Sequence, residues 1–250
     1  MIFASLPPRD AFFETVWYLI DTYASFFIRG IMFTLLLSIV GTLGGFILSL
    51  FLTVIRTSEI DDRRDSFMVK SLKKIGHYIT QIYITVFRGT PMIVQAMIFY
   101  YGISRMRISW WTPLVAGLVV VTLNTTAYIA EVIRSGINGI DKGQMEAARS
   151  LGFSRRKAMF LIILPQAIKN SLPAIGNEFI VNLKDTAVLS VIGVSELFRA
   201  TQLATAPNYR TTEGFFIAAI MYLLLTYVTS KVIHYLEHKK PNAKKVSSHV

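Results

Sequence analysis

Cysteine is absent from this 250-residue chain, and Asp, Glu, Lys and Arg together make up only 16% of it. The absence of cysteine excludes disulfides, cysteine-based zinc sites and thiol catalysis. No G-x-x-x-x-G-K-[ST] loop is present, so we expect that the chain does not bind and hydrolyse ATP unaided. Soluble domains usually contain about 25% charged residues, so this shortage of charge argues against an ordinary water-soluble enzyme.

Histidine is scarce as well, with four residues in the chain. His234 and His238 are four residues apart, which can place two metal ligands on one helical face, but no H-E-x-x-H pattern surrounds them. Lysines follow them, which favours a solvated helix end. We therefore predict no metal site, no cofactor bound by this chain and no catalytic residues.

Apolar residues are abundant instead: 53% of the chain is hydrophobic, and the mean hydropathy is +0.49. A membrane-spanning helix needs about 20 mostly apolar residues to cross ~30 Å of hydrocarbon. Gly41, Gly44 and Gly45 in the first candidate would let a neighbouring helix approach closely. In the second, Thr90 is the expected N-cap and Pro91 the first helical residue. Five segments are predicted to span the membrane, namely residues 26–55, 83–104, 113–137, 172–198 and 214–236.

The 26 Lys and Arg residues outnumber the 15 Asp and Glu residues, which leaves a formal net charge of +11. These cations are unevenly distributed between the two sides: 17 lie at or beyond the ends of the first, third and fifth spans, with Arg134 near the end of the third counted among them, and five lie on the opposite side. Lys and Arg are enriched in the cytoplasmic loops of membrane proteins, so the N-terminus is predicted outside and the C-terminus in the cytoplasm. The same sidedness argues against a nucleic-acid-binding surface.

The predicted organisation has three parts. Residues 1–25 form an N-terminal segment on the outer side, and residues 26–237 form a transmembrane domain of five helices. Within that domain, residues 138–170 form a long cytoplasmic loop. Residues 238–250 form a basic cytoplasmic tail.

The long cytoplasmic loop contains two helical patterns. Residues 145–151 lack helix breakers and predict two helical turns that end with Gly152 at the C′ position. A second amphipathic stretch reaches Leu164 and is expected to stop at Pro165. From these residues alone, the loop is as well explained by a surface hairpin joining two spans as by a docking element.

The loop also carries a spaced motif: Glu146-Ala147-Ala148, then Gly152, then nine residues, then Ile162, Leu164 and Pro165. This pattern resembles the signature of ABC importer permeases. The flanking segments resemble the polar amino-acid branch of that family, over roughly residues 26–236. They are Phe87-Arg88-Gly89-Thr90-Pro91, Ala127-Tyr128-Ile129-Ala130-Glu131, Arg134, Gly136, Gly143-Gln144, Leu164-Pro165-Gln166-Ala167 and Asn182-Leu183-Lys184-Asp185-Thr186.

The resemblance implies an all-α membrane protein with five transmembrane helices and cytoplasmic coupling helices, like a type I ABC importer permease. It implies the permease subunit of an ATP-driven importer of polar amino acids in the bacterial cytoplasmic membrane, which is not itself an enzyme. The expected partners are two cytoplasmic ABC ATPase subunits that hold the ATP and Mg, a second permease copy or paralogue, an extracytoplasmic amino-acid-binding protein and membrane lipid. No nucleic acid is expected.

In that family the loop forms coupling helices that dock into a cleft of the ATPase. Ala147 and Ala148 would keep one face small for close approach, Glu146 would meet basic or amide groups, and Gly152 would allow a sharp turn. Arg149 would add a salt bridge at the rim, although solvation explains most such charges. The residues assigned to ATPase coupling are Glu146, Ala147, Ala148, Arg149, Leu151 and Gly152.

Two predicted spans carry polar residues at helical spacing, although an ionisable group at the bilayer centre costs about 2.5–3.5 kcal/mol on insertion scales. A zwitterionic amino acid needs an anion for its ammonium group and a cation or helix N-terminus for its carboxylate. Arg88 is expected to anchor the membrane boundary instead of binding substrate. The residues assigned to a substrate path are Asn124, Tyr128, Glu131, Glu178, Asn182, Lys184 and Asp185.

Two alternatives remain at this point. The polar residues could join helices to each other, with Lys184 paired to Glu178 or Asp185 and Asn124 bonded to a neighbouring backbone. The chain could also be an ion-coupled secondary transporter of small polar solutes. Such transporters often contain internal repeats, which are not evident here, and the Glu-Ala-Ala loop would have no role in them.

Overall fold

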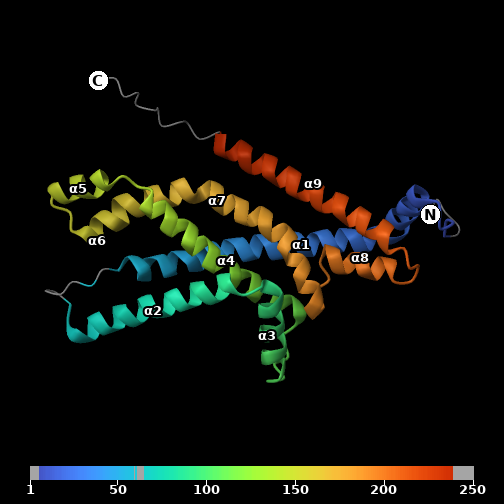
Figure 1. The fold of residues 1–250 in the computed structure, drawn as a ribbon, viewed down its shortest axis with the longest axis horizontal. Helices are drawn as coiled ribbons and strands as arrows, with labels where there is room; N and C mark the ends of the chain where they lie inside the picture. The colour runs from blue at the N-terminus through green and yellow to red at the C-terminus, as the bar shows by residue number, and fades with distance from the viewer. Residues whose placement is uncertain (1–5, 59, 61–64, 239–250) are drawn as a thin grey trace.

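The computed structural model describes residues 6–58, 60 and 65–238, and over these residues every regular element is a helix (Figure 1). The predicted all-α class is confirmed. One element, η1, is a single π-helical turn, and another, η2, is a short 3-10 helix. The elements are α1 (Phe12–Thr57), α2 (Phe67–Gly89), α3 (Met92–Ser104), α4 (Pro113–Asn138), α5 (Lys142–Ser150), α6 (Arg155–Ala158), η1 (Met159–Ile163), α7 (Leu164–Asp185), η2 (Thr186–Ile192), α8 (Leu197–Thr205) and α9 (Thr211–His238).

Four helical stretches are long and apolar enough to cross a membrane: Phe12–Thr57, Pro113–Asn138, Arg155–Ile192 and Thr211–Leu236. The bent pair α2 and α3 supplies a fifth span when the two helices are counted as one. The structure therefore contains the five predicted spans. The third and fifth predictions agree with α4 and α9 to within a few residues.

Helix α1 is 46 residues long, about 69 Å at 1.5 Å per residue, and runs along most of the molecule (Figure 1). It begins at Phe12, well before residue 26, and bends at Tyr23, where φ is −113° and ψ is 19°. Most of the segment predicted as 1–25 is therefore the first part of α1. Its location on the outer side of a membrane stays a prediction.

The glycines of α1 let α4 approach its backbone. A Cβ atom on Gly41 would lie 2.2 Å from Cγ1 of Val121, and one on Gly45 would lie 2.9 Å from Cβ of Thr125. Real Cβ atoms essentially never lie within 3.0 Å of another residue's atoms, so a larger residue at either position would force its neighbours to shift. The predicted role of these glycines in close helix contact is confirmed, and a buried apolar cluster that includes Leu37 and Val121 forms beside them.

The second span is broken, which its prediction as one helix over 83–104 missed. Helices α2 and α3 meet at an angle of 111°. Pro91 disfavours the helical conformation at the residue before it, and Thr90 has an extended backbone with φ of −121° and ψ of 146°. Thr90 is the C-cap of α2 and its hydroxyl donates to the Val86 carbonyl at 2.8 Å, so its prediction as the N-cap of α3 was wrong.

The fourth span belongs to a longer helical run that extends over Arg155–Ile192. The second amphipathic stretch therefore does not stop at Pro165 as predicted. Proline lacks an N–H group, and its ring collides with the carbonyl four residues earlier in a regular helix. The wider turn of η1 directly precedes Pro165, and within it Leu164 N–H donates to the Met159 carbonyl. The π turn therefore lets the helix continue through the proline.

The same run ends before the predicted Phe198. Gly193 stops η2 with a φ of +90°, a conformation that glycine adopts without a Cβ clash. Three residues later Glu196, which is fully buried, caps α8: Oε2 accepts from Phe198 N–H and Oε1 from Arg199 N–H, both at 2.8 Å. The hydroxyl of Tyr222 in α9 also donates to Glu196 at 2.8 Å. One carboxylate thus fixes α8 against α9.

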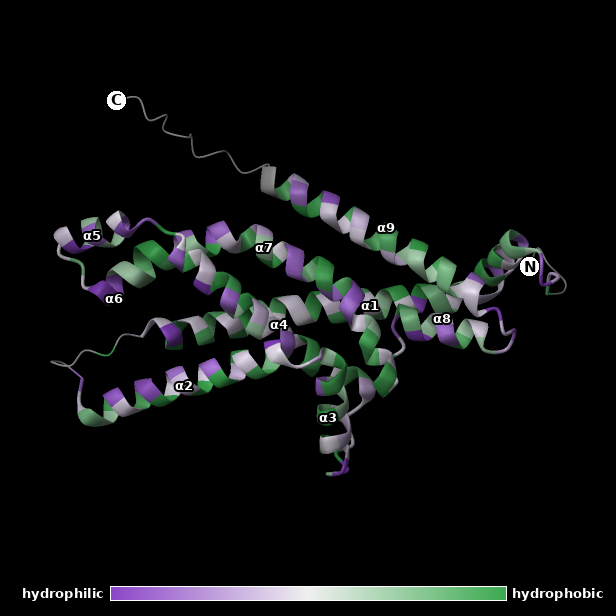
Figure 2. Cartoon of the chain, viewed as in Figure 1, coloured by the Kyte–Doolittle hydropathy of each residue, from purple (hydrophilic) through white to green (hydrophobic). Residues whose placement is uncertain are grey.

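Hydrophobic residues predominate along α1 and α9, whereas hydrophilic residues recur on the α5–α6 hairpin and along α2 (Figure 2). Many of the apolar side chains on the long helices are exposed. Phe51 in α1 is 64% exposed and Leu223 in α9 is 65% exposed. Apolar surface on this scale is typical of contact with lipid or with another protein. Of the tail predicted at 238–250, only the backbone of His238 lies among the described residues.

We predict that Gly41→Ala destabilises the protein and that Gly102→Ala does not. The first substitution places a methyl group against Val121, and overpacking of this kind costs about 1–3 kcal/mol. No atom lies within 4 Å of a Cβ atom on Gly102, which is in α3. Thermal unfolding of the purified variants in detergent measures the difference, and equal melting temperatures would refute the close α1–α4 contact.

Candidate functional site

The predicted coupling loop folds into a helical hairpin, α5 and α6, at one end of the molecule (Figure 1). The Asp141 side chain caps α5 by accepting a first-turn N–H at 2.7 Å. The helix ends in a Schellman motif: Phe153 N–H donates to the Ala148 carbonyl at 3.1 Å, and Gly152 N–H donates to the Arg149 carbonyl at 3.0 Å. Gly152 has φ of +84°, so its predicted C′ position is confirmed.

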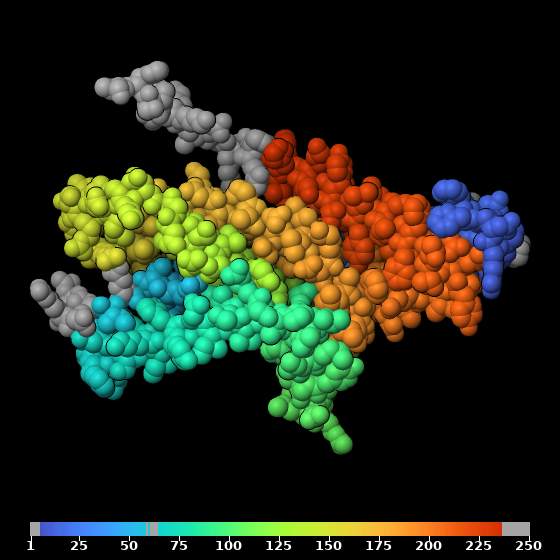
Figure 3. Space-filling view, in the orientation of Figure 1, coloured from blue at the N-terminus to red at the C-terminus, as the bar shows by residue number. Residues whose placement is uncertain are grey.

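The surface of the hairpin differs in one respect from the expected docking face. Glu146, Ala147 and Arg149 are exposed, and Leu151 at the helix end is 78% exposed. Ala148 is only 2% exposed, so it does not contribute to the outer surface. Of the two alanines, Ala147 therefore supplies the small exposed surface. Figure 3 shows the hairpin as a protruding end of the molecule.

The hairpin is firmly joined to the long helix behind it. Helix α6 continues through η1 into α7, and α5 packs against η1. The Gln166 side chain of α7 also donates to Gln144 Oε1 of α5 at 3.5 Å. Helix α5 is therefore in direct contact with the helical run that contains α7.

A second group of functional candidates forms a polar cluster near the other end of α7. The Arg88 guanidinium lies over the Tyr128 ring, with Cζ 5.4 Å from the ring centroid. Arg88 and Asp185 are close enough to Glu178 to act on its carboxylate electrostatically, and Lys184 acts likewise on Asp185. Glu178 is half-buried, whereas Arg88, Lys184 and Asp185 are exposed in the single chain. We call these five residues the polar cluster.

The polar cluster lies where two helices lose their regular geometry. Helix α2 ends at Gly89, one residue after Arg88, and α7 changes into η2 after Asp185. Helix α3, whose N-terminus follows the break in α2, packs against η2. Helix ends carry partial charges, and broken helices of this kind form substrate sites in other transporters.

Two of the predicted path residues are instead bonded inside the helix bundle. Asn182 is 4% exposed, and its Nδ2 donates to the hydroxyls of Thr42 at 2.9 Å and Thr125 at 3.0 Å. Asn124 Nδ2 donates to Gln95 Oε1 at 3.0 Å and to the carbonyl of Phe87 at 3.4 Å. These bonds fit the interhelical role that the sequence left open for asparagines.

Glu131 lies outside the polar cluster. It forms an ion pair with Arg56 of α1 at 3.1 Å and a second with Arg134 on its own helix. The two arginines hold the carboxylate at the end of α4 that lies near the hairpin. This geometry fits a structural role as well.

Sequence reasoning did not assign Arg88, Gln95 or Glu196 to functional positions. Arg88 carries a usable signal, because a cation directly before a Gly-Thr-Pro break inside an apolar segment has few structural explanations. Gln95 Nε2 donates to the carbonyls of Phe87 and Thr90 at 2.9 and 3.0 Å, which pattern analysis does not reveal. Among the described residues no three His, Asp or Glu side chains converge as metal ligands.

The family described as "Binding-protein-dependent transport system inner membrane component" matches residues 66–240. The glutamine transport system permease protein of Escherichia coli (strain K12) is 35% identical, over 85% of this chain and 91% of that protein. The arginine transport system permease protein of Bacillus subtilis (strain 168) is 36% identical, over 86% of this chain and 92% of that protein.

A solved structure described as an amino acid ABC transporter with histidines aligns with a TM-score of 0.78 and 36% identity, over 92% of this chain and 99% of that chain. The fold is therefore that of a type I ABC importer permease, as the sequence predicted. The family match covers more than half of the chain and includes the hairpin and the polar cluster. The chain thus belongs to the inner membrane components of binding-protein-dependent transport systems, the permeases of ABC importers.

Proposed function

We propose that this chain is the permease subunit of an ATP-driven importer of polar amino acids in the bacterial cytoplasmic membrane. The glutamine and arginine permeases and the amino acid ABC transporter described above support this substrate class. Membership in a binding-protein-dependent family favours this function over an ion-coupled secondary transporter. ATP and Mg would be held by separate ATPase subunits, and this chain would carry out no chemistry on them.

The observation that carries the proposal is the continuous helical run over Arg155–Ile192. This run begins in the hairpin and passes the polar cluster at Asp185. An ATPase that grips α5 and moves it would displace α7 as well, because α5 packs against η1. Movement at the hairpin would thereby change the geometry of the polar cluster.

The hairpin end of the molecule would face the cytoplasm. Its exposed surface carries a group of cations, and cytoplasmic loops of membrane proteins are enriched in Lys and Arg. The N-terminus would then lie outside, where an amino-acid-binding protein delivers the substrate. The cations of the hairpin are Lys142, Arg149, Arg155, Arg156 and Lys157.

The polar cluster contains groups that suit the two ends of an amino acid. Arg88 offers a planar guanidinium for a carboxylate, and Glu178 and Asp185 offer carboxylates for an ammonium group. Because Arg88, Lys184 and Asp185 are exposed in the single chain, a second permease copy or paralogue would be needed to enclose them. Two ATPase subunits would then drive alternating access in this dimer.

The energy source can be tested in proteoliposomes that contain the permease, its ATPase and the binding protein. We expect amino-acid uptake to continue when ATP is supplied and ionophores collapse the ion gradients. Uptake that stops with the gradients and ignores ATP would instead identify a secondary transporter.

Substitution of the hairpin should uncouple transport from ATP. We expect Glu146→Lys, which reverses an exposed charge, and Gly152→Asp, which forces a side chain into a left-handed conformation, each to lower uptake about tenfold or more. Membrane insertion should persist.

Gly139→Ala is the matched control, because Gly139 precedes the hairpin with an ordinary φ of −81° and should retain uptake. If ATPase co-purification and transport both survive the Glu146 and Gly152 substitutions, α5 is not the coupling helix.

Neutralisation within the polar cluster should impair transport more than protein level. We expect Asp185→Asn and Lys184→Gln to reduce uptake and to change substrate-stimulated ATPase activity, because each removes a charge from the proposed path. Glu14→Gln, which neutralises an exposed acid in the first turn of α1, is the control. Equal losses of protein level and uptake would indicate a structural role for Asp185 and Lys184.

A further inference from the structure

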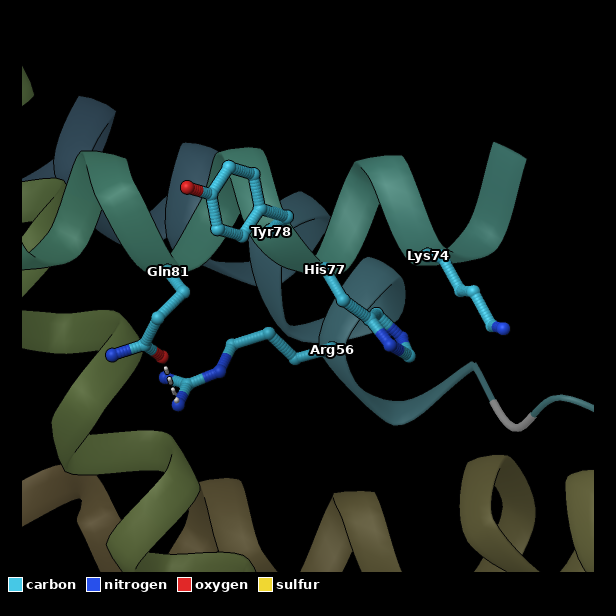
Figure 4. A pocket seen from close by; sticks show the side chains of 5 residues that line it. All are labelled: Arg56, Lys74, His77, Tyr78 and Gln81. Carbon is cyan, nitrogen blue, oxygen red and sulfur yellow. Dashed lines mark hydrogen bonds between the residues drawn. The ribbon is translucent and has the colours of Figure 1, made fainter. Parts of the chain in front are cut away.

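A basic pocket lies where α1 ends beside α2 (Figure 4). The end of α1 and the start of α2 lie at the same end of the molecule as the hairpin (Figure 1). Arg56 comes from the last turn of α1, and Lys74, His77, Tyr78 and Gln81 come from α2. The pocket is open to the surface and has a volume of about 400 Å³. Neither the hairpin nor the polar cluster contributes a residue to it.

The pocket retains positive charge after its internal bonds are counted. Arg56 uses one N–H to reach Glu131 at 3.1 Å and another to reach Gln81 at 3.4 Å, so three of its five donors remain. Glu131 also binds Arg134, so this group of two arginines and one glutamate keeps a net positive charge. The side-chain ammonium group of Lys74 makes no hydrogen bond or ion pair with another residue that the structure describes.

One carbonyl of the last turn of α1 is hydrogen-bonded by side chains at this helix end. The carbonyl of Ile55 accepts from the Ser58 N–H at 3.2 Å, from the Ser58 hydroxyl at 2.6 Å and from His77 Nε2 at 2.8 Å. The His77 side chain thus joins α2 to the last turn of α1, which holds this ring of the pocket lining in place.

The surroundings of the pocket are apolar, which points to a lipid as the source of the anion. On α2, Ile75 is 55% exposed and Ile79 is 60% exposed, and on α1 Phe51 is 64% exposed. Tyr78 lines the pocket and is 69% exposed, and tyrosine is enriched where a bilayer meets water. A soluble phosphate would gain nothing from these side chains, whereas acyl chains would cover them.

We propose that this pocket binds the phosphodiester headgroup of an anionic phospholipid such as phosphatidylglycerol. Lys74 and the free donors of Arg56 contact the phosphate, and the acyl chains lie along the exposed apolar faces of α1 and α2. Basic pockets between transmembrane helices on the cytoplasmic side are known to suit anionic headgroups. The site is independent of the transported substrate.

The test is native mass spectrometry of the full-length protein in its purified transporter complex, titrated with phosphatidylglycerol or phosphatidylcholine in detergent. We expect retention of phosphatidylglycerol over phosphatidylcholine, and a loss of about fivefold in its binding for Lys74→Gln. Lys231→Gln is the matched control, because it removes the same charge from another helix. Lys231 lies in the C-terminal part of α9, stacks on the Tyr227 ring and does not line the pocket.

Three results would overturn the proposal. Equal binding losses in the Lys74 and Lys231 variants would place the lipid elsewhere. Displacement of the lipid by inorganic phosphate or glycerol phosphate would identify a soluble phosphate as the ligand. Retention of the lipid by the isolated permease but not by the complex would show that protein covers the pocket.

Discussion

Backbone N–H and C=O groups in an apolar environment must find their hydrogen bonds inside the protein, and this constraint shapes the chain at each place where a helix is interrupted. At the 111° break between α2 and α3, the side-chain amide of Gln95 donates hydrogen bonds to the carbonyls of Phe87 and Thr90, which lack helical partners there. Asn124 then holds Gln95 in place from α4. At α8, the carboxylate of Glu196 takes two N–H groups of the first turn. No buried side-chain nitrogen or oxygen of the described residues lacks a partner.

These satisfied interruptions position the parts that function requires. The break after Gly89 leaves Arg88 at a helix end over the Tyr128 ring, where a regular helix would have continued past it. The π turn before Pro165 keeps the hairpin in line with α7. A break at Pro165 would have separated the docking surface from the polar cluster. Coupling in the proposed importer therefore depends on the different effects of two prolines. The helix continues through Pro165, and it breaks at Pro91.

Much of the fold could be predicted from local sequence. The 3.6-residue periodicity and apolar length identified α4 and α9 closely, and the motif around Gly152 identified the end of α5, because each depends on neighbours in sequence. The prediction failed at Thr90 and Pro165. Both lie beside prolines, and whether a proline breaks a helix depends on groups that are distant in the chain or on a non-standard turn. The same limit applies to the candidate site, where residues on one predicted stripe separated into buried Asn182 and exposed Asp185.

The sequence alone determined the class of protein, the number of spans and the family, because hydropathy, charge sidedness and a spaced motif are local or additive properties. The tertiary structure decided which polar residues hold helices together and which remain available. Asn124 and Asn182 found partners across helices, whereas Arg88 and Asp185 lie exposed near the ends of α2 and α7. The excess of cations similarly indicated a cytoplasmic side, but only the meeting of α1 and α2 brought Arg56 and Lys74 into one pocket. Such pairings depend on helix angles, which side-chain packing between distant segments sets.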